Sequence, residues 1–151
     1  MFEKNLQDLI KGIRSHKRDG EAYVSKCIAE IRKELKGSDA SLKANGILKL
    51  VYLQLLGHDI SWASFHVVEV MSLARFAHKR SGYLASTQSF TPDTDVVLLC
   101  TNLLKKEFQS KNQYEMGLAL NCLGNIATKD LSRDLLEDVA TMLSSSKPYL
   151  R

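Results

Sequence analysis

The sequence is poor in the residues that break helices or build disulfide frameworks: it has two prolines, eight glycines and three cysteines among 151 residues. Scarce proline and glycine favour long helices over the many turns of an all-β domain. The odd number of cysteines, without any Cys-x-x-Cys spacing, argues against a disulfide framework and a cysteine zinc site. We therefore expect a helical cytosolic protein in which Cys27, Cys100 and Cys122 are reduced core thiols.

Long apolar runs are missing as well. No run approaches the ~20 residues needed to span a bilayer, and residues 1–4 contain no apolar signal core. The protein is therefore expected to touch a membrane only from outside. Apolar residues make up 44% and charged residues 25%, as in a soluble folded domain. The net charge of +4 permits an acidic partner (a phosphoinositide head group, an acidic peptide or a nucleic acid) but equally suits an ordinary basic surface.

Catalytic and cofactor motifs are also missing. The chain has no Gly-x-Ser-x-Gly elbow, no P-loop and no Gly-x-Gly-x-x-Gly. The histidines do not stand at metal-ligand spacing; we interpret His58-Asp59 as a capping or surface feature, and His66, four residues before Val70, as a packing residue. The five tyrosines and five phenylalanines mostly occupy core positions and do not alternate with Lys or Arg. We predict no enzymatic activity, no metal, no cofactor and no nucleic-acid binding.

Apolar residues recur every three or four positions along almost the whole chain, which predicts amphipathic helices. Capping signals divide the pattern into eight helices of 11 to 18 residues. Among these signals, Thr91-Pro92-Asp93 predicts the start of the sixth helix, with Pro92 at its first position. Asn112 and Glu115 predict a capping box at the start of the seventh. The expected helices cover about residues 2–16, 23–36, 42–56, 61–71, 76–89, 92–108, 113–127 and 129–143.

The helices also repeat in pairs. Gly46 and Gly82 lie 36 positions apart, and residues 43–54, 79–90 and 116–127 align at steps of 36 or 37. Helix pairs at a fixed period are typical of a solenoid. We predict an all-α, right-handed α-solenoid of HEAT/armadillo-like helix pairs. Residues 144–151 resemble the start of a further repeat without a polar capping unit, so we expect residues 1–151 to be the N-terminal part of a longer array.

Two basic groups are candidate binding sites. Lys11, Arg14, Lys17 and Arg18 lie at the end of the first helix, and Arg14, four residues after Ile10, borders its apolar stripe. An arginine there is suited to bind a carboxylate with two hydrogen bonds, or simply to complement the helix dipole. Lys43 and Lys49, with Lys36 nearby, are suited to phosphoinositide heads, or form an ordinary solvated helix edge.

Long segments of the chain resemble the large adaptins, the trunk subunits of clathrin-adaptor complexes. They are FEKNLQDLIKGIRSHK (2–17), LKANGILKLVYLQLLGHDISWASFHVVEVMS (42–72), HKRSGYLASTQSF (78–90), LCTNLLKKEF (99–108), GLALNCLGNIATKDLSRDL (117–135) and KPYLR (147–151). The resemblance implies a solenoid trunk that embraces a small sigma adaptin in a heterotetrameric adaptor complex. Such a complex sorts transmembrane cargo from endosomal or Golgi membranes to lysosomes or vacuoles, is recruited by an Arf-family GTPase, and has no enzymatic activity. It implies a cytoplasmic protein that is peripheral on endosomal and Golgi membranes and transport vesicles.

The resemblance also implies roles for individual residues. Arg14 falls where these adaptins keep an arginine beside the sigma subunit, near the acidic side chain of a dileucine cargo signal. Lys43 and Lys49 match two basic positions of a phosphoinositide site, although its neighbouring basic positions are Ala44 and Asn45 here. Phe65 and Val68 fall at an Arf-GTPase contact.

One rival stays open at this point. Free-standing VHS or ENTH-like domains, which bind peptides or phosphoinositides, also have about eight helices in a chain of this length. The missing C-terminal cap and the segment KPYLR (147–151) favour the adaptin interpretation. A stable monomer of residues 1–151 would favour the rival.

Overall fold

The computed structural model describes residues 4–16 and 18–151, so Phe2 and Lys17 lie outside the described part of the chain. That part contains eight α-helices and no strand, which confirms the predicted all-α class. The α-helices are α1 (Leu6–Ser15), α2 (Gly20–Lys36), α3 (Ala40–Leu55), α4 (Ser64–Met71), α5 (Phe76–Ser89), α6 (Cys100–Phe108), α7 (Gln113–Ile126) and α8 (Lys129–Leu143). Three short 3-10 helices are η1 (Ser61–Ala63), η2 (Asp95–Leu99) and η3 (Pro148–Leu150).

Several helices begin at side-chain caps that the sequence indicates. The Asn5 side chain accepts from the Asp8 amide while the Asp8 carboxylate accepts from the Asn5 amide, a full capping box for α1. Asp39 caps α3 and Thr128 caps α8 in the same way, each with one side chain. These bonds satisfy amides that have no partner inside the helix, and so they define where the helices start.

One predicted helix start and one predicted capping box are wrong, although α7 does begin after Asn112 as predicted. Thr91, Pro92 and Asp93 form a turn, closed by the Thr94 amide donating to the Thr91 carbonyl at 2.9 Å, and the chain enters α6 only through η2. Asn112 does cap α7, but Glu115 does not complete a capping box because its carboxylate binds Ser110 and Lys79. The 3-10 entries also explain why the α-helices run from 8 to 17 residues, shorter than expected.

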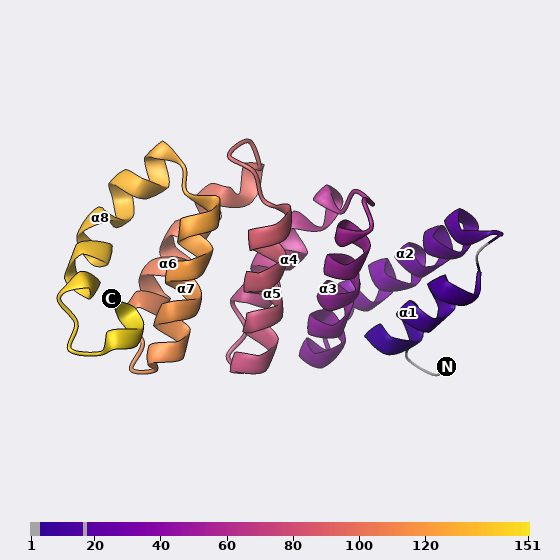
Figure 1. Cartoon of the computed structure of the whole chain (residues 1–151), viewed down its shortest axis with the longest axis horizontal. Helices are drawn as coiled ribbons and strands as arrows, with labels where there is room; N and C mark the ends of the chain where they lie inside the picture. Colours follow the sequence, from indigo (N-terminus) through magenta and orange to yellow (C-terminus); the bar gives the residue numbers. More distant parts are fainter. Residues whose placement is uncertain (1–3, 17) are drawn as a thin grey trace.

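The helices pack as successive pairs in an α-solenoid. Figure 1 shows α3, α5 and α7 side by side in one layer, with α4 and α6 behind them and the two chain ends at opposite ends of the stack. Contacts between neighbouring pairs join residues exactly one period apart: Ser86 Oγ lies 3.2 Å from Cys122 Sγ, and Lys79 Nζ lies 3.3 Å from Glu115 Oε1, both across 36 residues. The predicted repeat register is therefore confirmed.

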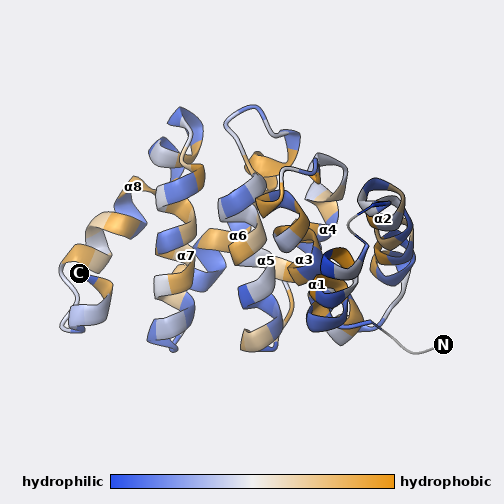
Figure 2. Ribbon diagram, turned by 45° about the vertical axis from the view of Figure 1, so that its right-hand side comes forward, coloured by the Kyte–Doolittle hydropathy of each residue, from blue (hydrophilic) through white to orange (hydrophobic). Residues whose placement is uncertain are grey.

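A continuous apolar core runs between the two layers. Figure 2 shows that each helix carries both hydrophobic and hydrophilic residues, and the buried ones from every α-helix belong to one cluster. Ile47, Leu50 and Leu53 of α3 are completely buried. The three cysteines are buried as predicted, and burial raises the pKa of Cys100 to about 12 and that of Cys122 to about 11. Their thiols are therefore unreactive in the folded chain.

Glycine at position 82 lets two helices approach closely. A Cβ atom at Gly82 would lie 2.5 Å from the backbone nitrogen of Met71, at the end of α4. Its counterpart one repeat earlier, Gly46, is less constrained, because a Cβ atom there would lie 3.2 Å from Cδ2 of Leu35. The same residue at the same repeat position is thus required sterically only in α5.

Charged side chains also lie inside the stack. Lys79 of α5 donates to both Glu107 oxygens of α6, at 2.7 and 2.9 Å, and both residues are buried. Glu115 of α7 adds a second carboxylate, which also accepts from the Ser110 hydroxyl. One ammonium group therefore joins three helices from two neighbouring pairs.

Candidate interaction surfaces

The described residues offer no cluster of metal-ligating side chains. No group of three His, Cys, Asp or Glu side chains is placed to hold a metal within residues 4–16 and 18–151. Asp59 is exposed and closes the turn before η1: it accepts from the amide and hydroxyl of Ser61, which lowers the pKa of its carboxyl, while the N-cap residues of η1 and α4 are Ile60 and Ala63. None of the described helices is both long and apolar enough to cross a membrane.

His66, predicted as a packing residue, is partly buried at the edge of α4. Its side chain is 30% exposed, with Nδ1 3.4 Å from Glu69 Oε2. The residues of α4 that are fully buried are Val67, Val70 and Met71.

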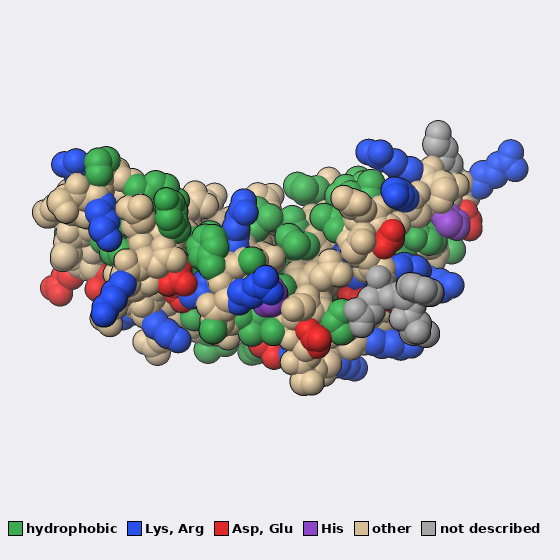
Figure 3. Space-filling model, turned by 90° about the horizontal axis from the view of Figure 1, so that it is seen from below, with side chains coloured by type: hydrophobic (Ala, Val, Ile, Leu, Met, Phe, Trp, Pro, Cys, Tyr) green, Lys and Arg blue, Asp and Glu red, His purple; other side chains and the backbone are tan. Residues whose placement is uncertain are grey.

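The face formed by α3, α5 and α7 is hollowed and carries apolar side chains, visible along the upper outline of Figure 3. Between α5 and α7 lies a groove of about 220 Å³ lined by Arg80, Tyr83, Leu84, Thr87, Leu118 and Asn121. Leu84 is 43% exposed although it belongs to a helix interior. Tyr83 and Arg80 in the lining of the groove are of the residue types that contribute most to protein–protein binding.

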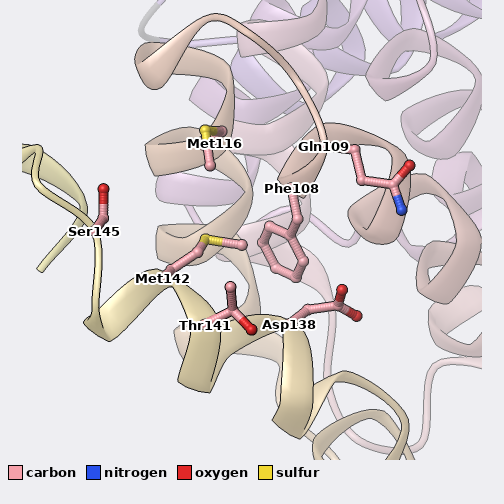
Figure 4. Close-up of a pocket in the computed structure, with 7 residues that line it drawn as sticks. All are labelled: Phe108, Gln109, Met116, Asp138, Thr141, Met142 and Ser145. Carbon is pink, nitrogen blue, oxygen red and sulfur yellow. The ribbon is translucent and has the colours of Figure 1, made fainter.

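A second pocket lies at the end of the stack, between α6, α7 and α8. It measures about 370 Å³, and Phe108, Met116 and Met142 form its apolar walls. Figure 4 shows Met142 and Phe108 pointing toward one another across it, with Asp138 and Thr141 of α8 along one side.

Arg14 is exposed in the last turn of α1, and within the described residues its guanidinium forms no ion pair. Its neighbour Ile13 packs against the core. The arginine therefore stands beside the apolar seam of α1 and α2, as the sequence predicts, and its five donors are available to a ligand.

Lys43 and Lys49 both lie on α3, but their ammonium groups are already paired. Lys49 is 3% exposed; it donates to Glu34 at 2.6 and 2.7 Å and to the Lys4 carbonyl at 3.0 Å. Lys43 forms an ion pair with Glu69 of α4. Any anionic ligand at these residues would have to compete with two carboxylates of the protein itself.

An apolar patch lies on α4 and η2, which contact each other. Phe65 is 69% exposed and Val68 is half-buried. η2 adds Leu98 and Leu99, exposed at 63% and 54%. These leucines turn outward because the 3-10 turn of η2 buries Val96 and Val97.

Comparisons with known proteins agree with this geometry. Residues 20–151 match the family described as adaptin N-terminal region. Over the whole chain the sequence is 52% identical to AP-3 complex subunit delta-1 of Bos taurus, and 54% identical to AP-3 complex subunit delta of Schizosaccharomyces pombe. It spans only 12% and 18% of the length of these relatives.

A structural comparison points the same way. The chain is similar to part of a homology model of the full-length AP-3 complex in an intermediate open conformation. The TM-score is 0.66 and the sequence identity 44%, over 74% of this chain and 20% of the other. The helical stack is therefore the same architecture as the corresponding part of that complex.

Proposed function

The chain belongs to the adaptin N-terminal region family, and from this we propose that it serves as a non-enzymatic subunit of a vesicle-coat adaptor complex. The observation that carries the proposal is identity of 52% and 54% to AP-3 delta subunits over the whole chain. In this role the protein works in the cytoplasm, at the surface of endosomal or Golgi membranes and transport vesicles. It helps to sort transmembrane cargo toward lysosomes or vacuoles.

The partner proposed for the hollowed face of α3, α5 and α7 is a small sigma adaptin. Leu84 and Leu118 supply apolar contact area there, and Arg80 stands beside them as a donor. A binding surface of this kind gains most of its free energy from a few central apolar and arginine side chains. The groove between α5 and α7 is accordingly the expected centre of the contact.

Co-expression with small sigma adaptins, followed by size-exclusion chromatography, tests the proposal. We expect the chain to elute together with one of them, and Leu84→Asp to abolish this because it places a charge in the groove. The matched control is Leu136→Asp, which changes an even more exposed leucine on α8. If the wild-type chain elutes separately from every sigma adaptin tested, the proposed sigma contact is wrong.

Arg14 is proposed to hold the acidic side chain upstream of a dileucine cargo signal, next to the sigma subunit. Its exposure and its place beside the seam of α1 and α2 support this role. In the assembled complex, Arg14→Glu should weaken binding of a dileucine peptide by about 10-fold or more, the scale of a lost charge-assisted hydrogen bond. Arg18→Glu is the control with the same charge change; equal affinity of both variants would contradict the role.

Phe65 and Val68 are proposed as contacts for an Arf-family GTPase, and the exposed leucines of η2 support the proposal by enlarging the apolar patch. Phe65→Asp should reduce GTPase-dependent recruitment of the complex to membranes without lowering the melting temperature. Recruitment at the wild-type level would remove this site.

Lys43 and Lys49 stay proposed phosphoinositide contacts. Their pairing with Glu69 and Glu34 implies a weak site. Replacing Lys43 by Gln should lower binding to phosphoinositide vesicles if the site is used, and unchanged binding would eliminate it.

A further inference from the structure

The two long edges of the solenoid differ in charge. One edge, here called the basic edge, consists of the loops that lead into α3, α5, α7 and η3, and it faces the viewer in Figure 3. Its exposed cations are Lys36, Arg75, Lys111 and Lys147. The opposite edge is richer in acids: its loops and the helix starts that follow them carry the exposed carboxylates Asp59, Asp93, Asp95 and Asp130, together with the exposed cations Arg18 and Lys129.

Three of the cations on the basic edge follow the repeat. Arg75, Lys111 and Lys147 lie 36 positions apart (111 − 75 and 147 − 111). Because the structure stacks neighbouring pairs at this same period, the repeats that begin at α5, α7 and η3 each place one cation at the same point of the edge, whereas the repeat that begins at α3 has Asp39 there. The three side chains therefore form a row along one side of a rigid stack.

The positive charges of this row are available to a binding partner. In the described part of the chain, Lys43, Lys49 and Lys79 are paired with carboxylates, whereas no carboxylate lies within ion-pair distance of Arg75, Lys111 or Lys147. All three are exposed. Asp39, the exposed acid of this edge, has its carboxylate engaged by the amides of Ser41 and Leu42.

Local stability does not explain these cations. Arg75 is the N-cap residue of α5, where no described side chain caps the helix, and Lys111 directly precedes the N-cap of α7. The helix dipole disfavours positive charge at this end. The acids of the opposite edge obey the rule: Asp130 lies in the first turn of α8 and Asp59 caps the turn at Ser61. Residues that break a local rule without a structural gain point to function.

Exposed aromatic rings accompany the cations. Tyr114 and Tyr149 are both more than half exposed on the basic edge, and their rings meet edge to face with centroids 5.4 Å apart. Tyrosine is favoured at the boundary between lipid head groups and water. Rings packed against each other are poorly placed to stack on successive nucleic-acid bases, so the edge favours a lipid surface over RNA.

We propose that the basic edge docks on the surface of an anionic bilayer, with Arg75, Lys111 and Lys147 as its charged contacts. The inference rests on the proposed function, because it supposes that the protein acts at a membrane. The residues that it assigns to lipid binding differ from Lys43 and Lys49. Negative lipids attract basic residues near the surface by about fivefold in affinity for each residue. Three such residues acting together account for binding that one exposed lysine would not give.

Vesicle sedimentation of the 151-residue chain tests the docking surface. The probes are phosphatidylcholine vesicles with and without about 20% phosphatidylserine. We expect binding only to the anionic vesicles, and its loss at high salt because screening weakens exposed charges. Binding to both vesicles alike, or to neither, overturns the proposal, as does a chain that binds single-stranded RNA more tightly than the anionic vesicles.

Two triple variants with the same net charge test whether vesicle binding depends on where the cations lie or only on the total charge of the protein. Arg75→Glu, Lys111→Glu and Lys147→Glu together should reduce binding by on the order of 100-fold. Arg18→Glu, Lys26→Glu and Lys129→Glu change three exposed cations elsewhere, and each triple variant lowers the net charge of +4 by six, to −2. The control should keep most of the binding; an equal loss in both variants would reduce the effect to net charge and overturn the assignment.

One single variant distinguishes binding from structure. Arg75→Asn supplies a favourable N-cap, so it should raise the melting temperature while reducing vesicle binding by about fivefold. A lower melting temperature, or unchanged vesicle binding, would mean that Arg75 serves the fold. Elution with a sigma adaptin, measured on the same variant, should stay unchanged, so that failure of the lipid surface and failure of the adaptor role give different results.

Discussion

The helix pairs α3–α4 and α5–α6 both carry a lysine and a glycine at equivalent repeat positions, Lys43 and Lys79, and Gly46 and Gly82, yet these residues have different surroundings. Lys43 pairs with Glu69, whose side chain is 46% exposed, whereas Lys79 pairs with Glu107, which is 4% exposed. Lys79 also receives Glu115 from the following pair. A repeated sequence therefore does not produce repeated energetics, because the burial of each ion pair depends on the helices stacked on both sides of it.

The difference matters because charge is costly to bury. An exposed ion pair contributes little, since water solvates its partners when they separate. A buried carboxylate that loses its partner keeps the full cost of desolvation. We therefore expect equivalent substitutions in the two pairs to have very different effects.

The largest expected effect is that of Lys79→Met. It leaves Glu107 buried without a counter-charge, and should lower the free energy of unfolding by about 3–5 kcal/mol. The same change one repeat earlier, Lys43→Met, should cost at most about 1 kcal/mol. Urea denaturation of both variants measures the contrast. Similar losses in the two would show that the pairs are equally buried in solution.

The next effect compares the two glycines. Gly82→Ala places a methyl group against the backbone of Met71, and should destabilise the protein by about 1–3 kcal/mol despite the better helix propensity of alanine. Gly46→Ala meets side-chain atoms alone, Cδ2 of Leu35 at 3.2 Å and Oε2 of Glu34 at 3.4 Å; its propensity gain of about 1 kcal/mol should offset these contacts. Thermal melting decides the order, and a Gly82→Ala protein as stable as wild type would show that α4 and α5 are further apart.

The smallest effect concerns acid stability. The Ser110 hydroxyl, and then Lys79, lower the pKa of Glu115 below its ordinary value of 4.5, against the opposing effect of burial. A lowered pKa in the folded state gives stability that is present above pH 4.5 and lost as the pH falls through the folded value. Ser110→Ala should raise this pKa, and so make the loss of stability below pH 4.5 less steep.

Melting temperatures measured from neutral pH down to about pH 3 test this prediction. Ser132→Ala, at an exposed serine of α8, is the matched control. An identical acid profile for wild type and Ser110→Ala would mean that Ser110 does not bind Glu115. In the described part of the chain, the pair of Lys43 and Glu69 has no equivalent hydrogen bond from a serine hydroxyl. An effect of Ser110→Ala on acid stability would therefore be a further difference between the two repeats.

Much of the fold follows from local patterns. The predicted fifth helix, residues 76–89, has the bounds of α5, although its buried residues include Lys79, Ser81, Gly82 and Ser86 and do not form an apolar stripe. The start of the sixth helix was wrong, because Thr91, Pro92 and Asp93 suit a turn as well as a helix cap. Only the packing of Val96 and Val97 selects the 3-10 entry.

The candidate surfaces were less predictable. Arg14 is exposed as expected, and the sequence placed it correctly because a helix-end arginine needs no tertiary partner. Lys49 was expected on a charged edge but is buried, since Glu34 from another helix neutralises it. Leu98 and Leu99 escaped notice because their outward orientation depends on a 3-10 turn that periodicity does not reveal. The cation row at Arg75, Lys111 and Lys147 was detectable from the period alone, once the loops were compared instead of the helices.

The sequence by itself determined the class of the protein: eight amphipathic helices, the 36-residue register and the adaptin resemblance all reside in neighbouring residues and in their spacing. Tertiary structure alone decided which cations are used up inside the protein and which face the solvent. Lys79 and Glu107 are 28 residues apart, and Lys49 and Glu34 are 15 apart. No local sequence pattern pairs residues at such separations, because the packing of whole helices decides which lysine lies beside which carboxylate. The cations that remain unpaired lie on the surface, where other molecules can contact them.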